Sequence, residues 1–560
     1  MAALRCALLS VAGIALAAEE YQRKLPAFPL RTSGRFIVDA NGTRVRLHCV
    51  NWYGAHLPQM VANGMNYRSP GDIAKTITAS SFNCVRLPFS LDMLGNFTVP
   101  QPKVSLAACP ELQDSSPLEI FDATVLELTK HGVMVILNNH ISTRMWCCSS
   151  SDGEGLWYTA KYPEDAWLDA MGFMAKRYQD NPLVMGFDLR NEIRPSGLMW
   201  PHWGTGGKTD WAKAAVSGAQ RVLDSNANML IIISGLYFSI FLCQVPTYPV
   251  HTEVPLLGRT VYTAHEYNWF NFHLAARKSI EVYMVIVAAA FPMSWLCRQR
   301  CVGQRCQRCR CRCRAFRCER CSSRCSVFRE IEPCWEFSVA ALLAALFALS
   351  LKILPRFLQS CDFNGFLVAI TCGFLTPICA LVSAVLWMRA AFLVIAGRME
   401  RSEALQLEMS AAVALRGESP RRDNHCSFQP QRHAKRCRSM TCFLAIVILI
   451  TFGALGYVWV EFGRYQAFEQ ELDFKWGFLL SAPSPVPVWL GEFGENQESL
   501  WWHHMIRYLQ ERDVDFAYWS VNGEKYTGVP ESFGLFMEDF VTVRHPWKLA
   551  QLQSVTNRSD

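Results

Sequence analysis

Eight short apolar runs, each followed by a segment with helical periodicity, leave this chain few folds to adopt. Six runs lie before residue 272 and two after residue 461: VRLHCVNW, FNCVRL, VMVILN, LVMGFDLR, MLIIISG, TVYTAHEY, VPVWLGEF and DFAYWSVN. Buried strands that alternate with helices favour a parallel sheet, and eight such units favour a closed barrel. We therefore predict an α/β fold, a (β/α)8 TIM barrel that is interrupted after its sixth strand.

The interruption, residues 273–462, has a different composition. It contains four apolar stretches: Glu281–Cys297, Phe337–Leu354, Gly365–Met388 and Thr441–Val460. The last three reach the length of about 20 residues that a membrane-spanning helix needs, and the first is marginal. The chain as a whole is 51% hydrophobic with a mean hydropathy of +0.09, which is high for a soluble enzyme. We predict a helical membrane insertion with four transmembrane spans.

Two independent patterns place the barrel outside the cytosol. Residues 1–18 have a positive residue, a short apolar run and a small-residue motif, which predict a signal peptide. Both parts of one barrel must lie on the same side of a membrane, so the number of spans must be even. The segments after the first and third spans are basic, which favours a cytosolic location for both. We expect a protein of the secretory pathway, membrane-anchored, with its barrel extracellular or lumenal.

The run QRCQRCRCRCRAFRCERC, residues 304–321, admits several interpretations. A basic cytosolic loop beside anionic lipid is the simplest of them. Cys306-x-x-Cys309 and Cys318-x-x-Cys321 have the spacing of zinc ligands, but the alternating arginines would repel a cation. No aromatic residues accompany the charge in a pattern that would indicate nucleic-acid binding. A gene-model error that translates non-coding sequence would also produce such a block, and the protein would then be secreted without an anchor.

Two carboxylates stand at the ends of predicted strands. Glu192 follows LVMGFDLRN, and Glu492 lies near the end of VPVWLGEF. The carboxyl ends of barrel strands converge on one pocket. Cleavage of a glycosidic bond requires two carboxylates across a cleft, one to protonate the leaving oxygen and one to attack or to activate water. A single glutamate at a strand end is more often a surface charge, and the presence of the pair favours catalysis.

Around these positions the sequence resembles glycoside hydrolase family 5, the cellulase-type retaining glycosidases, and in particular its plant-like members. The motifs are FNCVRLPFS, ILNNH, WCCSSSDGEG, the Asn-Glu pair, TAHEY, GEFG and AYWSVNG, and the resemblance covers residues 25–272 and 463–547. It implies Glu192 as acid/base and Glu492 as nucleophile. The substrate-binding or supporting residues that it implies are Arg86, His140, Asn191, His265, Tyr267 and Trp519.

The resemblance and the chemistry agree on the roles of these groups. Arg86 and the Tyr267 hydroxyl should keep Glu492 ionised, because a cation and a hydrogen-bond donor both favour a carboxylate. Glu192 must hold a proton near neutral pH, so it needs a drier or more negative setting. Asn191 is implied to hold the sugar 2-hydroxyl, and Trp519 to form a flat floor under the ring. Neither a cofactor nor a metal is implied, because the carboxylates suffice.

Two sets of residues have open interpretations. Cys49 and Cys84 lie on neighbouring predicted strands and are either paired or simply buried, while Cys147 and Cys148 are expected to pair elsewhere or to stay free. Five tryptophans are candidate sugar platforms, although ordinary packing explains each as well: Trp52, Trp146, Trp200, Trp203 and Trp269.

The expected organisation is a signal peptide at 1–18, barrel parts at 25–272 and 463–550, and the membrane insertion at 273–462. The resemblance implies an O-glycoside hydrolase that cleaves β-glycosidic bonds of a polysaccharide, in particular an endo-β-1,4-glucanase. Two alternatives remain: a β-glycosidase that cleaves glycolipid at the membrane, and an inactive carbohydrate-binding membrane protein. The intact pair of carboxylates argues against the inactive protein.

Overall fold

The computed structural model describes residues 25–149, 151–274, 277–278, 281, 456–457, 459–526 and 528–556. The chain divides into two compact units, Met1–Asn271 with Glu469–Asp560, and Phe272–Phe468. The predicted signal peptide and nearly all of the predicted membrane insertion lie outside the described residues. Within the described part of the chain, no helix is both long and apolar enough to cross a bilayer.

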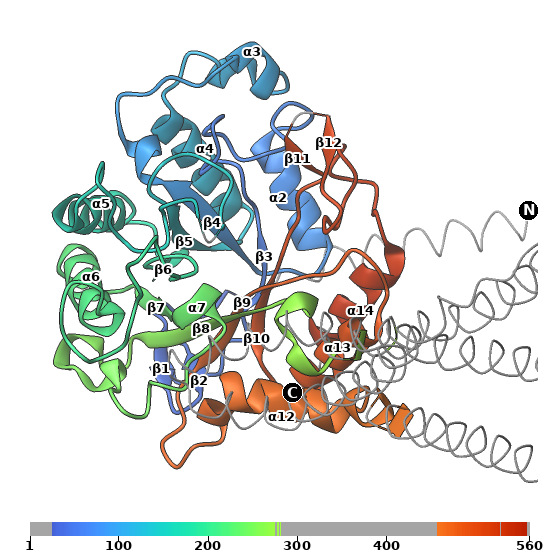
Figure 1. Cartoon of the computed structure of the whole chain (residues 1–560). Helices are drawn as coiled ribbons and strands as arrows, with labels where there is room; N and C mark the ends of the chain where they lie inside the picture. The colour runs from blue at the N-terminus through green and yellow to red at the C-terminus, as the bar shows by residue number, and fades with distance from the viewer. Residues whose placement is uncertain are drawn as a thin grey trace, which may run out of the picture. The chain divides into compact units, whose positions relative to one another are not determined.

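The first unit is built on a closed barrel of eight parallel strands in the order β10-β3-β4-β5-β6-β7-β8-β9 (Figure 1). The strands are β3 His48–Asn51, β4 Cys84–Ser90, β5 Met134–Ile141, β6 Val184–Asp188, β7 Leu230–Ser234, β8 Thr260–Glu266, β9 Val488–Phe493 and β10 Asp515–Tyr518. Each of the eight predicted runs overlaps one of them, so the predicted α/β barrel is confirmed. β9 and β10 follow the interruption and close the sheet between β8 and β3.

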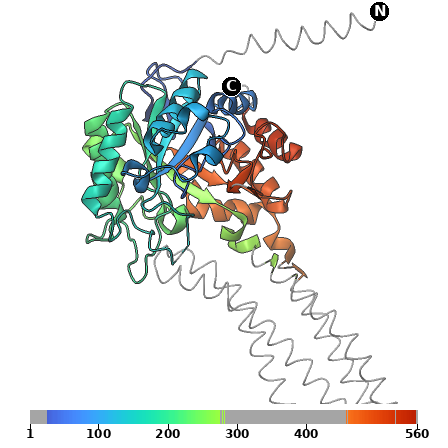
Figure 2. The same ribbon diagram turned by 90° about the horizontal axis from the view of Figure 1, so that it is seen from above.

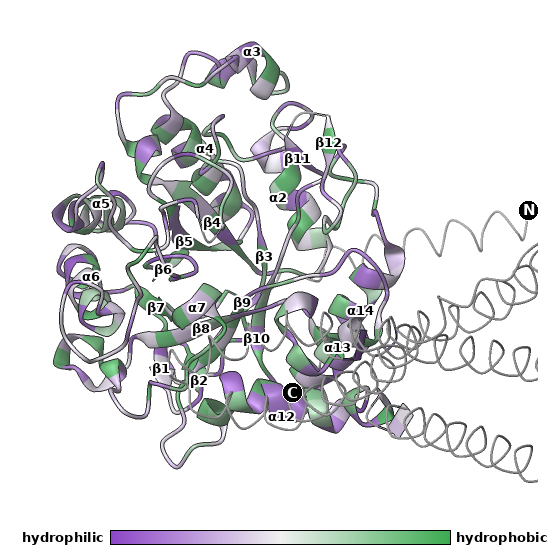
Figure 3. Ribbon diagram, in the orientation of Figure 1, coloured by the Kyte–Doolittle hydropathy of each residue, from purple (hydrophilic) through white to green (hydrophobic). Residues whose placement is uncertain are grey.

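Helices surround the barrel, as the view from above shows (Figure 2). The longer ones are α2 Pro70–Ala79, α4 Pro117–Lys130, α5 Glu164–Arg177, α6 Trp211–Ser225, α12 Tyr465–Lys475, α13 Leu500–Arg512 and α14 Pro546–Thr556. Their starts follow local chemistry: Ser116 and Glu119 form a capping box on α4, and Ser69 accepts the Asp72 N–H on α2. Purple, hydrophilic positions lie on these outer helices, whereas green dominates the strands (Figure 3).

The lower part of the barrel interior is an apolar cluster, called the lower layer here. Its buried members are Leu30, Ile37, Val45, Leu47, Cys49, Cys84, Met134, Ile136, Met185, Leu230, Ile232, Val261, Trp489 and Ala517. Leu30 and Ile37 come from the N-terminal hairpin of β1 Arg31–Ser33 and β2 Phe36–Val38, which therefore seals this end of the barrel. The lower layer is the hydrophobic core of the sheet.

Two residues further along the same strands the interior becomes polar. Side chains alternate between the faces of a strand, so a shift of two positions stays inside the barrel. By this step Cys49 leads to Asn51, Cys84 leads to Arg86, Ile136 leads to Asn138 and Val261 leads to Thr263. We call Asn51, Arg86, Asn138, Asp188, Thr263 and His265 the upper layer, and all six are buried. The upper layer forms the floor of the carboxyl end of the barrel.

A disulfide joins Cys49 to Cys84 across the neighbouring strands β3 and β4. The two residues are directly opposite in the parallel register, with their Cα atoms 4.4 Å apart. The sequence left the choice between pairing and simple burial open, and the structure selects pairing within the lower layer.

Candidate active site

All eight of the sequence-predicted site residues lie at the carboxyl ends of barrel strands. Arg86, His140, His265 and Glu492 are within β4, β5, β8 and β9, and Asn191, Glu192, Tyr267 and Trp519 follow β6, β8 and β10. Each of them is buried. The barrel therefore gathers side chains that are several hundred residues apart in the sequence.

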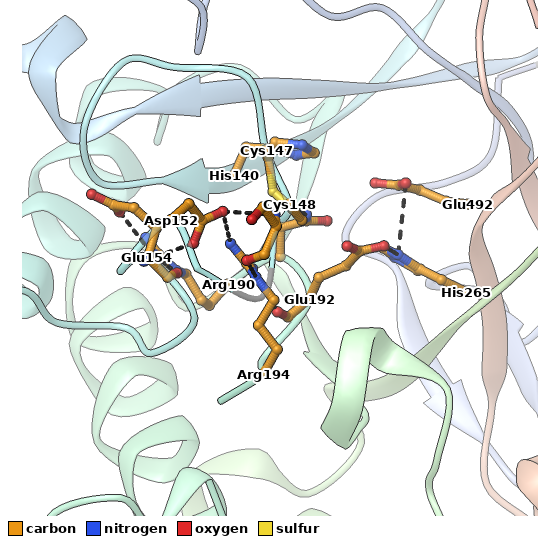
Figure 4. The surroundings of a disulfide bond; sticks show 12 residues. His140, Cys147, Cys148, Asp152, Glu154, Arg190, Glu192, Arg194, His265 and Glu492 are labelled. Carbon is orange, nitrogen blue, oxygen red and sulfur yellow. Dashed lines mark hydrogen bonds and ion pairs between the residues drawn. A yellow bond between two sulfur atoms is a disulfide. The ribbon is translucent and has the colours of Figure 1, made fainter. Parts of the chain in front are cut away.

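The two predicted catalytic carboxylates face each other across one imidazole (Figure 4). His265 Nδ1 lies 2.9 Å from Glu192 Oε1 and 3.7 Å from Glu492 Oε2. One ligand atom from each of these three residues lies within 4.8 Å of the other two. This close spacing fits the separation of about 5 to 5.5 Å that retaining glycosidases use and is below the 6.5 to 9.5 Å of inverting ones.

A β-bulge turns Glu492 toward the pocket. In β9, Leu490 pairs with Ala264 but Glu492 pairs with His265, so Gly491 is an extra residue in the ladder. A Cβ atom at Gly491 would lie 2.4 Å from Thr263 Oγ1 and 3.2 Å from His265 Nε2, so no larger residue fits there. The bulge at Gly491, packed against β8, thus sets the direction of the Glu492 carboxylate.

Glu192 reaches the pocket through a different backbone feature. Its φ angle is 45°, in the left-handed region that residues other than glycine rarely adopt. Arg194 Nη1 donates a hydrogen bond to the Glu192 carbonyl at 2.9 Å and holds this conformation. Backbone strain of this kind clusters at functional sites, where surrounding contacts maintain it.

Arg86 is the centre of the upper layer. Its guanidinium donates to Glu492 Oε1 at 2.5 Å and to Asp188 Oδ2 at 2.8 Å. It also donates to Asn51 Oδ1 at 3.0 Å and to Asn191 Oδ1 at 2.7 Å. A rigid fork of five N–H groups makes arginine suited to such convergent contacts. Arg86 therefore connects Glu492 with the residue that precedes Glu192.

The two carboxylates have different electrostatic settings. Burial raises the pKa of Glu192 to about 7; Asp152 acts in the same direction, while Arg194 and Arg86 oppose it. Burial also raises the pKa of Glu492, against the effects of His265 and Arg86. Glu492 has the direct guanidinium contact and the Tyr267 hydroxyl at 3.0 Å, so it is the better stabilised anion of the two.

The predicted contacts of Arg86 and Tyr267 with Glu492 are present in the structure. Burial nevertheless raises the pKa of Glu492, an effect that the sequence did not indicate. The expectation of a dry setting for Glu192 agrees with its raised pKa.

The histidines of the pocket are neutral near pH 7. Burial lowers the pKa of His265 to about 4, and burial together with His56 lowers the pKa of His140 well below its ordinary value. His140 Nδ1 bonds Asn138 Oδ1 at 2.8 Å, which orients its ring. Neutral imidazoles can hydrogen-bond both a protonated and an ionised carboxyl group, so they do not fix the charge state of the pair.

An aromatic wall lines one side of the pocket. Trp519 stacks on Tyr53 with ring centroids 4.9 Å apart and planes inclined by 5°, and His140 lies 5.7 Å from Trp519 on a nearly parallel plane. Of the other candidate platforms, Trp269 is 54% exposed and stacks on Tyr267, and Trp146 is 37% exposed. Trp52 and Trp203 are buried, and their indole N–H groups donate to backbone carbonyls, so they are structural.

Sequence reasoning missed several residues that hold the site together. Asn51, Asn138 and Asp188 were not identified, although a step of two from an apolar inward position leads to Asn51 and Asn138. Tyr53 was missed because nothing local distinguishes it from a core aromatic residue.

The expectation for Cys147 and Cys148 was wrong. The structure joins these adjacent residues to each other in a disulfide beside the pocket (Figure 4). A loop that brings both sulfurs against Asn191 holds them together, and this arrangement depends on tertiary contacts that the sequence does not display.

Two groups among the described residues have a spacing that would suit a metal ion: Glu192 with His265 and Glu492, and His140 with Cys147 and Cys148. The sulfurs of the second group share a disulfide, so they are not thiolate ligands in this state. The first group is engaged by Arg86 and Tyr267. Neither arrangement needs a metal to account for its contacts.

Comparison with known sequences connects this barrel to one family. Residues 38–291 match the cellulase family, glycosyl hydrolase family 5. A glycosyl hydrolase 5 family protein of Chamaecyparis obtusa is 35% identical over 270 residues, which are 45% of this chain and 46% of that protein. An endoglucanase of Paenibacillus polymyxa is 31% identical, over 43% of this chain and 62% of its own length. The major extracellular endoglucanase of Xanthomonas campestris pv. campestris is 36% identical, over 38% and 42%.

The chain thus spans roughly half the length of these curated relatives. Among solved structures, the catalytic domain of the Xanthomonas campestris major endoglucanase aligns with a TM-score of 0.53 and 18% identity, over 94% of this chain and 100% of that one. An endocellulase of Pyrococcus horikoshii, solved as a complex with cellotetraose, aligns with a TM-score of 0.53 and 16% identity, over 95% and 100%. At these identities the structural matches support the barrel fold.

Proposed function

We propose that this chain, whose residues 38–291 match the family 5 cellulases, is a retaining glycosidase that cleaves internal β-1,4 bonds of glucan. One observation carries the proposal: a carboxylate oxygen of Glu192 and one of Glu492 lie within 4.8 Å of each other at the carboxyl end of the barrel. The names of the relatives from Paenibacillus polymyxa and Xanthomonas campestris, both endoglucanases, support glucan as the substrate class.

In the first step, Glu492 attacks the anomeric carbon and Glu192 gives its proton to the leaving oxygen. Arg86 and Tyr267 hold the Glu492 carboxylate in place through its two oxygens. A pKa of about 7 leaves Glu192 protonated in a large fraction of molecules at neutral pH, as an acid catalyst requires.

In the second step, Glu192 acts as a base. Formation of the glycosyl-enzyme converts Glu492 to a neutral ester, so the repulsion that disfavours a second negative charge nearby disappears. Glu192, now ionised, takes a proton from the water that attacks the anomeric carbon, and the product keeps its β configuration.

Supporting residues have distinct proposed roles. Asn191 is oriented by Arg86 to contact the sugar 2-hydroxyl, His265 bridges the two carboxylates, and Trp519 presents its ring to the sugar. His140, fixed by Asn138, faces the same pocket beside Trp519. With these assignments, each of the eight predicted site residues has a proposed role.

We also propose, from the sequence, that residues 1–18 direct the chain to the secretory pathway and that residues 273–462 anchor it with the barrel lumenal or extracellular. One relative is named an extracellular endoglucanase, which supports the location of the barrel. Sodium carbonate extraction of membranes from cells that express the full chain is the test. Retention in the pellet supports the anchor, and complete release into the supernatant contradicts it.

The mechanism is tested by trapping the glycosyl-enzyme with 2,4-dinitrophenyl 2-deoxy-2-fluoro-β-cellobioside. Mass spectrometry of peptides should place the label on Glu492, and Glu492→Gln should prevent labelling. Glu192→Ala should still be labelled, because dinitrophenolate leaves without protonation. Proton NMR of cellopentaose hydrolysis should show the β anomer first. A label on another residue, or the α anomer as first product, would disprove the proposal.

A further inference from the structure

The loop of residues 147–149 and 151–154, called the cysteine loop here, follows β5 and lies against the segment of residues 190–194 that carries Glu192 (Figure 4). We propose that its Cys147–Cys148 disulfide is a positioning element for Asn191, so that the hydrolase is fully active only when this disulfide is formed. The inference rests on the proposed function and adds a residue pair that the glycosidase mechanism itself does not require.

The side-chain amide of Asn191 is held at both of its ends. Its Nδ2 donates to Cys148 Sγ at 3.3 Å and to Cys147 Sγ at 3.6 Å, while its Oδ1 accepts from Arg86 at 2.7 Å. Sulfur is a weak acceptor, but two bonded sulfurs together offer one fixed surface to the N–H groups. Different partners therefore orient the two ends of the amide: Arg86, in strand β4, binds the oxygen, and the sulfurs of the cysteine loop bind the nitrogen.

Ion pairs anchor the cysteine loop to the segment that carries Glu192. Asp152 pairs with Arg194 at 2.7 Å, and Glu154 pairs with Arg190 at 3.3 Å. Arg194 Nε also donates to the Ser149 carbonyl at 3.1 Å. Both arginines are fully buried, and a buried charge pair contributes little net stability, so a role in fixing geometry accounts for them better.

The cysteine loop is also bound to the residues that follow β5. The Glu154 carboxylate accepts the backbone N–H groups of Ser142 at 2.9 Å and Thr143 at 3.2 Å. The cysteine loop is thus held at both of its neighbours, the residues after β5 and the residues after β6. The disulfide is the point at which this anchored loop contacts Asn191.

Breaking the disulfide changes what Asn191 meets. A dithiol reductant supplies two electrons and two protons, so that the S–S bond becomes two S–H groups and the reductant becomes its own disulfide. The sulfurs then move from a bond length of about 2.05 Å to a non-bonded separation of roughly 3.5 to 4 Å. Both cannot remain where the disulfide held them, so the Asn191 amide loses its fixed partner. Cys147 and Cys148 are only partly buried, which gives a reductant access.

The experiment uses the full chain and the variant Cys147→Ser/Cys148→Ser, with kcat and KM measured on cellopentaose. We expect kcat/KM to fall on the order of ten-fold, mainly in kcat, because small misplacements of a positioning group have effects up to about a hundred-fold. In an Asn191→Ala background the same double substitution should cost nothing further, since residues that act through one another are not additive. Dithiothreitol should reduce the activity of the wild type to that of the double variant and leave the double variant unchanged.

The control is Cys49→Ala/Cys84→Ala, which removes the disulfide of the lower layer. It should lower the temperature of unfolding and leave kcat of the folded protein unchanged. Dithiothreitol should lower the activity of this control as much as it lowers that of the wild type. An unchanged kcat in Cys147→Ser/Cys148→Ser, or a loss that adds fully to that of Asn191→Ala, overturns the inference. If the double serine variant does not fold, the dithiothreitol response of the wild type decides.

Failure of the proposed function gives a different result. If the oxidised wild type hydrolyses no β-glucan, the endoglucanase proposal falls, and the same variants are then compared by calorimetric affinity for cellotetraose. Affinity that depends on the Cys147–Cys148 disulfide only when Asn191 is present supports the positioning role, and affinity that does not depend on it overturns that role.

Discussion

The lower and upper layers of the barrel are made by the same strands, two residues apart, yet they are chemically opposite. The lower layer is apolar and tied by the Cys49–Cys84 disulfide. The upper layer has an arginine, an aspartate, a histidine, a threonine and two asparagines, all of them buried, and hydrogen bonds join Arg86, Asp188 and the two asparagines.

The difference shows how one sheet separates stability from chemistry. Burial of apolar side chains stabilises the fold wherever it occurs, whereas burial of charges is unfavourable unless each has a partner. The upper layer is therefore tolerated because Arg86 satisfies Glu492, Asp188, Asn51 and Asn191 at once. We expect substitutions in the upper layer to affect turnover first, and substitutions in the lower layer to affect stability alone.

The largest expected effect comes from Glu492→Gln, next to the upper layer, where Glu492 accepts a hydrogen bond from Arg86. It should lower kcat by about 10⁴-fold or more, because the proposed nucleophile is removed. The temperature of unfolding should stay the same or rise, since a buried acid becomes a neutral amide of the same shape. Turnover of dinitrophenyl β-cellobioside and thermal unfolding measure the two. Glu253→Gln, at an exposed position, is the control, and a loss below about ten-fold would refute the assignment.

Arg86→Met tests whether the upper layer also contributes to stability. It leaves Asp188 and Glu492 without their cation, so the free energy of unfolding should fall by about 3–5 kcal/mol, and activity should be lost. Urea unfolding gives the free energy. Arg221→Met, in an exposed pair with Asp169, should cost less than about 1 kcal/mol. An equal loss in the free energy of unfolding for the two variants would show that the buried ion pairs stabilise the protein no more than the exposed pair does.

Ile136→Ala makes the opposite change, in the lower layer. Loss of a buried branched side chain should lower the free energy of unfolding by about 2–5 kcal/mol through lost burial and a residual cavity. At a temperature where the variant is folded, kcat should be that of the wild type. A drop in kcat without a loss of stability would mean that the two layers are not separable.

The smallest effect is expected in the pH profile. Because the raised pKa of Glu192 is about 7, kcat/KM should fall as the pH rises through about 7, where the acid loses its proton. Asp152 raises this pKa, so Asp152→Asn should move the alkaline limb to lower pH, by less than about one unit. Asp169→Asn, which removes an exposed partner of Arg221, should leave the limb in place. A shift to higher pH would contradict the proposed electrostatics of Glu192.

Much of the fold and of the site follows from local patterns. The eight strands were predictable because apolar runs of four to eight residues between turn and helix signals have few alternatives, and the chain returns to the same pattern after the interruption. The strand-end positions of Glu192, Glu492 and the six residues around them followed from the same runs together with the family resemblance. The Gly491 bulge and the left-handed Glu192 backbone were not predictable, because each depends on the neighbouring strand or loop.

The sequence by itself determined which residues stand at the strand ends, because side-chain alternation and strand length are properties of a few consecutive residues. Tertiary structure alone decided how those residues act on one another. Arg86 meets Glu492 across 406 positions of the chain, and the Cys147–Cys148 disulfide meets Asn191 across more than forty. The pKa of Glu192 depends on burial, and burial exists only once the barrel has closed and water has left the pocket.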